Sequence, residues 1–211
     1  MSDHLPDDGA ASSHDPAEDV VARKRLLRAA ARAARRQRDA AEVAACASLL
    51  AERVEQLPEV RRAAVVATYL STGSEPSTTA LVAGWRARGL SVLLPVVLPD
   101  LDLDWALDDG SRRAGALRGV AEPAGAQLGR DAVARADVLV VPALAVDRGG
   151  RRLGQGGGSF DRALARTRPD ALVVALVHDD EVPAGPLPVE PHDRPVDVVV
   201  TPSRVLVVRA R

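Results

Sequence analysis

The sequence is poor in aromatic side chains, with two tryptophans, one tyrosine and one phenylalanine among 211 residues. Proteins that bind single-stranded nucleic acid without sequence preference stack the bases on aromatic rings, and this chain offers few. Its formal net charge of -1 provides no general attraction to a phosphate backbone. We therefore expect no nucleic-acid partner, and a core built from valine, leucine and alanine.

Cysteine and long apolar runs are also scarce. A single cysteine, Cys46, excludes an internal disulfide and a zinc site built on several cysteines. No apolar run approaches the roughly 18 residues of a membrane span, and the amino terminus lacks the basic-then-apolar pattern of a secretory signal. Residues 1–14 are polar and are interpreted as a disordered tail. We expect a cytoplasmic protein without a membrane partner, in which residues 15–211 form a single domain.

Lysine occurs once in the chain. Of the 28 basic residues, Lys24 alone is not an arginine. A lone lysine can arise by chance. It can equally mark a site that needs a compact ammonium group, such as a phosphate contact, where the planar guanidinium of arginine fits less well. Composition leaves both interpretations open.

Capping patterns and apolar runs predict the helices and strands of the rest of the chain. Asp15-Pro16 with Glu18, and Asp39 with Glu42, are typical of helix starts, so we expect helices over residues 15–38 and 39–57. Buried strands are expected at 63–70, 90–96, 136–141, 172–177, 196–200 and 205–208, an edge strand at 101–107, loops at 108–130, and helices at 77–88 and from the glycine-rich segment to 168. This alternation predicts an α/β fold: an open, mostly parallel sheet with helices on both faces and an N-terminal helical pair. Ligands of such sheets bind beyond the carboxyl ends of the strands, which selects the loops at 71–76, 142–161 and 178–195.

Glycines are concentrated in one of these loops. Gly154, Gly156, Gly157 and Gly158 occupy four of five positions between a strand and a helical pattern. A strand, a glycine loop and a helix start direct backbone N–H groups at one spot and favour an anion there. Asp161, just inside the helix, would repel a polyphosphate unless a cation lay between them, which indicates Mg²⁺.

The glycines also have a purely structural explanation, because a tight turn with close packing of strand and helix would require the same residues. The Walker A spacing is absent, and so is a complete Gly-x-Gly-x-x-Gly motif with an acidic residue about 20 positions later. No Gly-x-Ser-x-Gly nucleophile elbow occurs. Phosphate binding at this loop would therefore require a phosphate loop of another kind.

Polar residues also follow the other strands. Glu75 either caps the next helix or lines a site. We interpret His178 and the two aspartates after it as a solvated turn, Asp193 as a candidate second metal carboxylate beside Asp161, and Asp197 as a residue that closes its loop. The arginine-rich first helix could contact RNA, but a solvated helix face is the more ordinary interpretation.

Several separated motifs together resemble the 5-formyltetrahydrofolate cyclo-ligase family, over about residues 20–205. VPALAVDRGGRRLGQGGGSFDRAL, at 141–164, is similar to the family block Pro-Gly-Leu-Ala-Phe-Asp … Arg-Leu-Gly-x-Gly-Gly-Gly-Tyr-Tyr-Asp-Arg. LPVEPHDRPVDVVVTPSRV, at 187–205, resembles its carboxyl-terminal His-Asp … Val-Asp … Thr-Pro signature. KRLLR at 24–28 fits an amino-terminal Lys-x-x-x-Arg, residues 70–75 fit the folate-binding strand end, and GVAEP at 119–123 fits Gly-Ile-x-Glu-Pro. The combination is specific, whereas one glycine loop is not.

The resemblance implies an ATP- and Mg²⁺-dependent ligase that closes 5-formyltetrahydrofolate to 5,10-methenyltetrahydrofolate through a phosphorylated formyl intermediate, an iminium phosphate, and releases ADP and phosphate. The substrate that it implies is a folate, and we expect a monomer. By position, it makes Lys24, Arg152 and Asp161 catalytic, and Asp161 and Asp193 ligands of Mg²⁺. The residues implied to bind ATP are Lys24, Arg28, Arg152, Leu153, Gly154, Gln155, Gly156, Gly157, Gly158 and Phe160, and those implied to bind folate are Leu70, Glu75, Gln155 and Ser159. The resemblance therefore favours a functional role for Lys24, the single lysine of the chain.

Three places depart from the family pattern. Ser159 and Phe160 stand where two tyrosines are common, Ala143 replaces a common glycine, and Arg118 stands where an aromatic residue is usual. Two of these departures lie where the family binds the pterin ring of the folate, so we expect them to affect folate affinity more than ATP binding. The alternative functions are a non-catalytic folate- or nucleotide-binding member of the family and an RNA-associated protein that uses the first helix.

Overall fold

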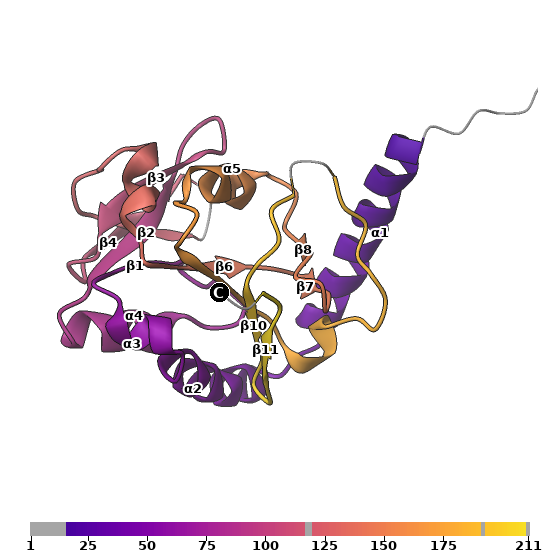
Figure 1. The fold of residues 1–211 in the computed structure, drawn as a ribbon, viewed down its shortest axis with the longest axis horizontal. Coiled ribbons are helices and arrows are strands. Elements are labelled where there is room, and N and C mark those ends of the chain that lie inside the picture. Colours follow the sequence, from indigo (N-terminus) through magenta and orange to yellow (C-terminus); the bar gives the residue numbers. More distant parts are fainter. Residues whose placement is uncertain (1–15, 117–119, 191–192, 210–211) are drawn as a thin grey trace, which may run out of the picture.

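The computed structural model describes residues 16–116, 120–190 and 193–209 (Figure 1). The expected tail at 1–14, the expected N-cap Asp15, and Arg118 and Gly119 lie outside these ranges. The helices are α1 (Pro16–Arg36), α2 (Ala40–Glu55), α3 (Pro58–Arg62), α4 (Thr79–Ala87) and α5 (Ser159–Arg166), with short 3₁₀ turns η1 (Arg130–Arg135) and η2 (Asp179–Glu181). Asp39 caps α2 as expected, because its carboxylate accepts a hydrogen bond from the N–H of Ala41.

Seven strands form one sheet in the order β11-β10-β9-β6-β1-β2-β3. Neighbours from β10 to β2 are parallel, whereas β11 and β3 add antiparallel edges. The open, mostly parallel sheet predicted from the sequence is confirmed. The strands are β1 (Val65–Ala67), β2 (Ser91–Val97), β3 (Leu103–Leu107), β6 (Val138–Pro142), β9 (Leu172–Leu176), β10 (Val198–Val200) and β11 (Val205–Val207), and two small hairpins pair β4 (Arg112–Ala114) with β5 (Ala121–Pro123) and β7 (Ala145–Val146) with β8 (Arg152–Leu153).

The central strands are apolar on both faces because helices cover both faces. All five residues of β9 are buried. One core lies between the sheet and α2, α3 and α4, and a second lies between the sheet and α5 with η1 (Figure 1). The two tryptophans anchor one core each, Trp85 the first and Trp105 the second, and both are fully buried.

Helix α1 stands apart from these layers. It lies at the side of the sheet near β7 and β8 (Figure 1), and its Leu27 and Ala31 pack against Leu144, Leu153 and Leu187. The two amino-terminal helices follow one another as expected. However, α2 packs against the sheet, whereas α1 packs against the segments around the glycine loop.

Prolines and the segment at 108–130 show local detail that the sequence did not indicate. Pro58 begins α3, because proline is tolerated in the first helical turn. Pro95 lies within β2. The pairing of β2 with β1 ends at Leu93, so Pro95 faces only the edge strand β3. The segment at 108–130 contains β4, β5 and the start of η1 in addition to loops.

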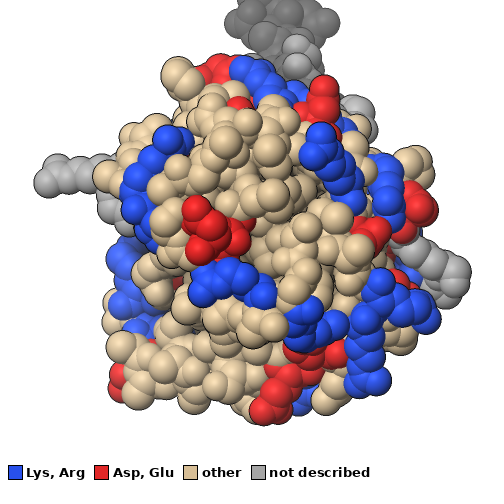
Figure 2. Space-filling model, turned by 90° about the vertical axis from the view of Figure 1, so that its left-hand side faces the viewer, with Lys and Arg blue, Asp and Glu red and all other residues tan. Residues whose placement is uncertain are grey.

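The surface near β3 and β4 carries acidic and basic side chains intermixed, without a patch of one sign (Figure 2). Ion pairs account for part of this mixture, such as Arg130 with Asp100 and Arg112 with Asp108. Among the helices that the structure describes, none combines the length and the apolar character needed to cross a bilayer.

Candidate functional site

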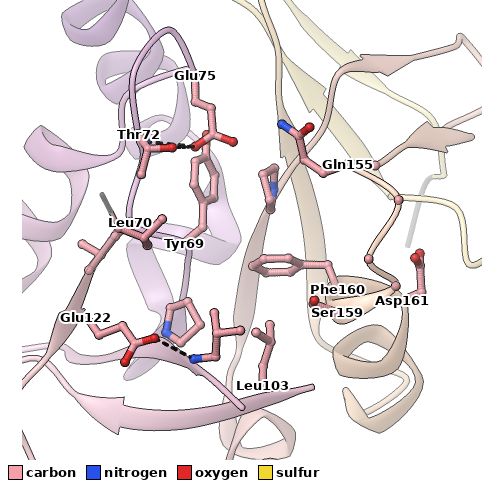
Figure 3. Close-up of a pocket in the computed structure, with 18 of the residues that line it drawn as sticks. Tyr69, Leu70, Thr72, Glu75, Leu103, Glu122, Gln155, Ser159, Phe160 and Asp161 are labelled. Atoms are coloured by element: carbon pink, nitrogen blue, oxygen red, sulfur yellow. Dashed lines mark hydrogen bonds between the residues drawn. The ribbon is translucent and has the colours of Figure 1, made fainter. Parts of the chain in front are cut away.

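A pocket of about 320 Å³ opens where β1 and β6 lie side by side. The chain leaves β1 toward β2 on one side and leaves β6 toward β9 on the other, which makes this edge the topological switch point where ligands of such sheets bind. Both the segment after β1 and the glycine loop line the pocket (Figure 3). Of the residues expected in the site, Leu70, Glu75, Arg152, Gly154, Gln155, Gly156, Gly157, Gly158, Ser159, Phe160 and Asp161 line it.

The glycine loop is held in place by the turn that precedes it. The Asp147 carboxylate accepts hydrogen bonds from the N–H groups of Gly149 at 2.8 Å, Arg151 at 3.0 Å and Leu187 at 2.9 Å. Gly150 has a φ of 76°, and a Cβ on it would lie 2.5 Å from the carbonyl oxygen of Val196. This packed turn fixes where β8 starts and therefore where the glycine loop begins.

Arg152 and Asp161 contact each other at the edge of the pocket. The Arg152 guanidinium is almost fully buried and donates a hydrogen bond to the Asp161 carboxylate. Two of the residues predicted to be catalytic are thus brought together, and each balances the charge of the other.

Helix α1 brings Lys24 and Arg28 to the same region. The Lys24 ammonium donates hydrogen bonds of 2.6 Å to Glu190 and 2.6 Å to Asp193. Burial alone would lower the pKa of Lys24, but these two carboxylates outweigh it and raise the pKa above its ordinary value. The Arg28 Nε donates to the carbonyl oxygen of Gly154 at 3.0 Å. The cations of the first helix therefore reach the glycine loop at Gly154 and the carboxylates of Glu190 and Asp193.

Four of the expected site residues lie outside the pocket lining. Lys24, Arg28 and Asp193 form the contacts just described. Leu153 is buried in the small apolar cluster beneath α1, so its side chain supports the loop from behind.

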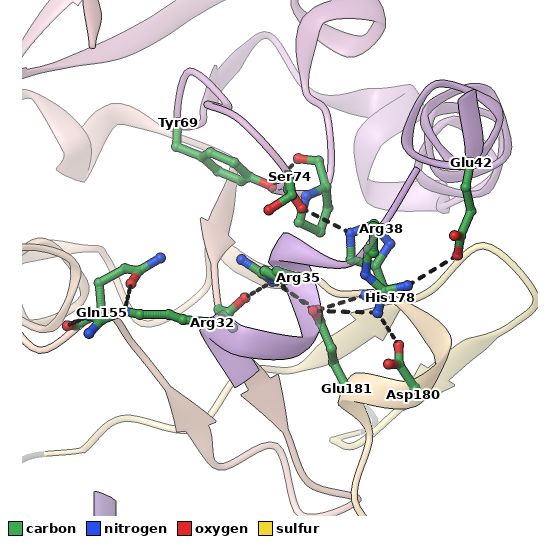
Figure 4. Close-up of polar contacts among 12 residues, drawn as sticks. Arg32, Arg35, Arg38, Glu42, Tyr69, Ser74, Gln155, His178, Asp180 and Glu181 are labelled. Atoms are coloured by element: carbon green, nitrogen blue, oxygen red, sulfur yellow. Dashed lines mark hydrogen bonds and ion pairs between the residues drawn. The ribbon is translucent and has the colours of Figure 1, made fainter. Parts of the chain in front are cut away.

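The sequence favoured a solvated basic face on the first helix; Arg23, Arg25 and Arg36 are exposed, but another side of α1 contacts the rest of the chain. One helical turn after Arg28, Arg32 donates to the side-chain and main-chain oxygens of Gln155, at 3.0 and 2.7 Å (Figure 4). Arg35 forms two hydrogen bonds with Glu181, at 2.7 and 2.8 Å. Arg38, two residues beyond the end of α1, pairs with Asp180. This face of α1 is therefore an internal contact surface.

The interpretation of His178 as part of a solvated turn was also wrong. Its side chain is 2% exposed, and its Nε2 lies 3.2 Å from the carbonyl oxygen of Ser74 (Figure 4). Burial lowers the pKa of His178. The Glu181 carboxylate also accepts a hydrogen bond from the N–H of His178, at 2.9 Å. The turn after β9 thus supports the loop that carries Glu75.

Several residues of the pocket were not predicted from the sequence. Tyr69 is buried, and its hydroxyl donates to the carbonyl oxygen of Pro76 at 2.6 Å. Burial raises the pKa of Tyr69 well above its ordinary value. Glu75 accepts hydrogen bonds from the N–H and the hydroxyl of Thr72, at 2.9 and 3.1 Å (Figure 3), so it closes its own turn instead of capping α4. The remaining unpredicted lining residues are Pro95, Val97, Leu103, Val120, Ala121, Glu122 and Pro142.

Glu122 and Phe160 form opposite parts of the pocket wall (Figure 3). Glu122, from the motif at 119–123, is buried and accepts a hydrogen bond from the N–H of Val97 at 3.0 Å. Phe160 meets Trp105 edge to face, with ring centroids 6.5 Å apart. The motif is visible in the sequence, but its spacing does not indicate which side chain reaches the pocket.

The chain is similar to known proteins over most of its length. Residues 20–202 match the family described as the 5-formyltetrahydrofolate cyclo-ligase family. The chain is 41% identical over 147 residues to the 5-formyltetrahydrofolate cyclo-ligase of Mycolicibacterium smegmatis, covering 67% of this chain and 75% of that protein. It is 35% identical over 164 residues to the enzyme of the same name from Escherichia coli, covering 74% and 87%.

The fold has a solved counterpart. The NMR structure of 5,10-methenyltetrahydrofolate synthetase from Aquifex aeolicus superposes with a TM-score of 0.76 at 27% identity, over 89% of this chain and 94% of that one. The resemblance seen in the sequence motifs is thereby confirmed. The chain belongs to the 5-formyltetrahydrofolate cyclo-ligase family.

Proposed function

We propose that this chain is the enzyme that closes 5-formyltetrahydrofolate to 5,10-methenyltetrahydrofolate with ATP, and that it does so in the pocket between β1 and β6. The family membership and the two curated relatives support the activity. The observation that supports this location is the convergence of Arg28, Arg152 and Asp161 on a glycine loop that also lines a largely apolar pocket.

The triphosphate of ATP would bind along the glycine loop. Glycine lets the backbone approach a phosphate closely, and Arg28, Arg152 and Lys24 supply positive charge around it. Phosphoryl transfer needs positioning and charge neutralisation more than covalent help from the protein. These residues provide both.

Asp161 and Asp193 would hold Mg²⁺. Within the described residues there is no group of three or more histidine, cysteine or acidic side chains that could hold a metal. Proteins commonly bind Mg²⁺ through one or two carboxylates while phosphate oxygens and water supply the other ligands, and Asp161 and Asp193 would be those carboxylates. The bound ion would neutralise charge on the phosphates. Arg152 and Lys24, which now contact these two carboxylates, would be free to turn toward the phosphates.

The folate would occupy the apolar part of the pocket. Leu70, Leu103 and Phe160 offer walls for a flat ring, and the carboxylates of Glu75 and Glu122 are acceptors for the N–H groups of a pterin. Transfer of the γ-phosphoryl group of ATP to the formyl oxygen gives ADP and an iminium phosphate. The N10 lone pair then attacks the formyl carbon, N10 loses its proton, and the C–O bond breaks to release phosphate. No protein nucleophile is required.

We further propose that residues 15–211 act as one monomeric domain in the cytoplasm. The seven strands join in one sheet, which supports a single folding unit. A role in binding RNA is not favoured, because the cations Lys24, Arg28, Arg32 and Arg35 of the first helix all contact other parts of the chain.

An absorbance assay tests the function, because the methenyl product absorbs in the near ultraviolet. We expect product only when 5-formyltetrahydrofolate, ATP and Mg²⁺ are all present. Asp161→Asn should lower turnover about 100-fold or more with an unchanged circular dichroism spectrum. Asp170→Asn is the matched control, because Asp170 is exposed and lies after α5, away from the pocket lining.

A wild-type protein that binds folate without forming product would favour the non-catalytic alternative. Normal turnover of Asp161→Asn would refute the metal assignment while leaving the activity in place.

A further inference from the structure

Helix α1 holds the first half of the glycine loop by its carbonyl groups. The Nε of Arg28 donates to the carbonyl oxygen of Gly154 at 3.0 Å. A terminal nitrogen of Arg32 donates to the carbonyl oxygen of Gln155 at 2.7 Å, and its Nε donates to the side chain of the same residue at 3.0 Å (Figure 4). The family resemblance implies a role in ATP binding for Arg28, but it gives none to Arg32.

Arg162 holds the second half of the loop from α5. One of its terminal nitrogens donates to the carbonyl oxygens of Gly157 at 3.2 Å and Leu101 at 2.7 Å, so it joins the loop to the turn between β2 and β3. The Nε of this arginine lies 3.5 Å from the buried carboxylate of Asp102. Gly158 has a φ of 71°, and a Cβ on it would lie 2.9 Å from a terminal nitrogen of Arg162, so any other residue would displace the guanidinium.

Each of these hydrogen bonds also sets the direction of an N–H group. None of the described peptide bonds is cis, and in a planar trans peptide the C=O of one residue and the N–H of the next point in opposite directions. The three held carbonyls therefore fix the N–H groups of the residues that follow them, which are Gln155, Gly156 and Gly158.

These three N–H groups face the pocket. All five residues at 154–158 line it, whereas the side chains of Arg28, Arg32 and Arg162 do not. The held carbonyls thus point out of the pocket, and the N–H groups that follow them point toward it. Within the described part of the chain none of these N–H groups donates to another residue, so an anion in the pocket can accept hydrogen bonds from all of them.

The arginines also make these N–H groups better donors. A carbonyl that accepts a hydrogen bond from a cation polarises its peptide group, which strengthens the N–H of the same group. Glycine gives the backbone more freedom than any other residue. Without the arginines, the peptide groups of the loop would be free to rotate and to present carbonyl oxygens to a phosphate.

We propose that Arg32 and Arg162 are positioning residues for the phosphates of ATP. Each holds one carbonyl of the glycine loop away from the pocket, so that the next N–H, of Gly156 and of Gly158 respectively, donates to the triphosphate. Neither arginine touches the nucleotide. This inference rests on the proposed function, because it takes the anion at the loop to be the triphosphate of ATP.

Amide signals in proton–nitrogen NMR spectra of the full chain test each peptide group separately. Without nucleotide, Arg32→Met should shift the amide of Gly156, and Arg162→Met should shift that of Gly158, because each variant loses the hydrogen bond at one carbonyl. The matched control is Arg25→Met, since Arg25 is exposed on α1 and donates no hydrogen bond to another described residue. It should leave both amides in place. ATP with Mg²⁺, added without folate, should shift both amides in the wild type.

The absorbance assay measures what the positioning contributes to the reaction. Arg32→Met and Arg162→Met should each lower kcat/KM for ATP about tenfold, which corresponds to about 1.4 kcal/mol. The KM of folate at saturating ATP and the circular dichroism spectrum should not change. Arg25→Met should keep the wild-type kcat/KM, although it removes the same charge.

The inference would be overturned if the amides of Gly156 and Gly158 did not respond to their own arginine, or if Arg32→Met and Arg162→Met kept the wild-type kcat/KM. An equal loss in Arg25→Met would also overturn it, because the arginines would then act as charges that attract ATP through space. Turnover by the wild type without any shift of these amides on ATP binding would overturn it and leave the activity in place. Shifts with ATP that depend on the two arginines, without any methenyl product, would refute the proposed activity and leave the positioning role standing.

Discussion

The ion pair between Arg35 and Glu181 fastens α1 to the rest of the chain. The two side chains are 5% and 6% exposed and share hydrogen bonds of 2.7 and 2.8 Å. Arg35 also donates to the carbonyl oxygen of Ala143, and Glu181 accepts from the N–H of His178. The pair therefore links α1 to the end of β6 and to the turn after β9.

Glu181→Ala should destabilise the protein by about 3–5 kcal/mol, because it leaves a buried guanidinium without a counter-charge. A typical domain is stable by only about 5–15 kcal/mol, so the loss is large. The control is Glu55→Ala, which removes the partner of Arg88 in a pair whose side chains are 33% and 39% exposed. The control should cost less than about 1 kcal/mol.

Urea unfolding measures the free energy of unfolding of both variants, provided that its dependence on urea concentration has the same slope in each. The double variant Arg35→Met/Glu181→Leu should recover most of the lost stability, because no unpaired charge remains. At a urea concentration that leaves Glu181→Ala folded, its KM for ATP should rise, because α1 carries Lys24 and Arg28 to the glycine loop. If Glu181→Ala loses no more stability than Glu55→Ala, this account of how α1 is attached is wrong.

Three further predictions concern acid stability, the glycine turn and the folate wall. Hydrogen bonds from Arg166, which outweigh the effect of burial, lower the pKa of Asp102 from 3.8 to about 2. The ionised Asp102 therefore stabilises the folded protein above pH 3.8, and this stabilisation is lost as the pH falls toward 2. Unfolding measured along an acid titration should show a loss of about 2 kcal/mol in the wild type that is missing in Asp102→Asn. Gly150→Ala should lower Tm by several degrees, because its φ is 76° and a backbone carbonyl lies 2.5 Å from the new Cβ; an unchanged Tm would contradict the packing described for this turn. Ser159→Tyr restores an aromatic residue to the pocket lining and should lower the KM of folate without changing that of ATP; a higher KM would show that serine is required there.

The sheet and the glycine loop could be predicted because their patterns are local. Apolar runs such as the one that forms β9 are typical of strands buried on both faces. The rule for parallel sheets then places the segment with Glu75 and the segment with Asp161 at one edge, and the pocket confirms this.

The destination of α1 could not be predicted, because its contacts join residues more than 100 positions apart. Lys24, Arg28, Arg32 and Arg35 are spaced by four, four and three residues, so they share one helix face. That spacing indicates a basic face, but it does not say whether water, RNA or the chain itself covers it. His178 looked solvated for the same reason, since its burial depends on long-range contacts such as the one with Ser74.

The pairing of Arg152 with Asp161 leads to a prediction about metal removal. The carboxylate assigned to Mg²⁺ contacts the cation assigned to phosphate, so each balances the other. Without Mg²⁺, ATP would face the carboxylate directly, and like charges at this distance repel. Asp161→Asn removes that repulsion and frees Arg152, so in EDTA the variant should bind ATP more tightly than the wild type. With Mg²⁺ present the order should reverse, because the variant has lost a ligand of the ion. Calorimetry under both conditions measures the two affinities, and a change in the same direction under both would show that the pair serves only the structure of the loop.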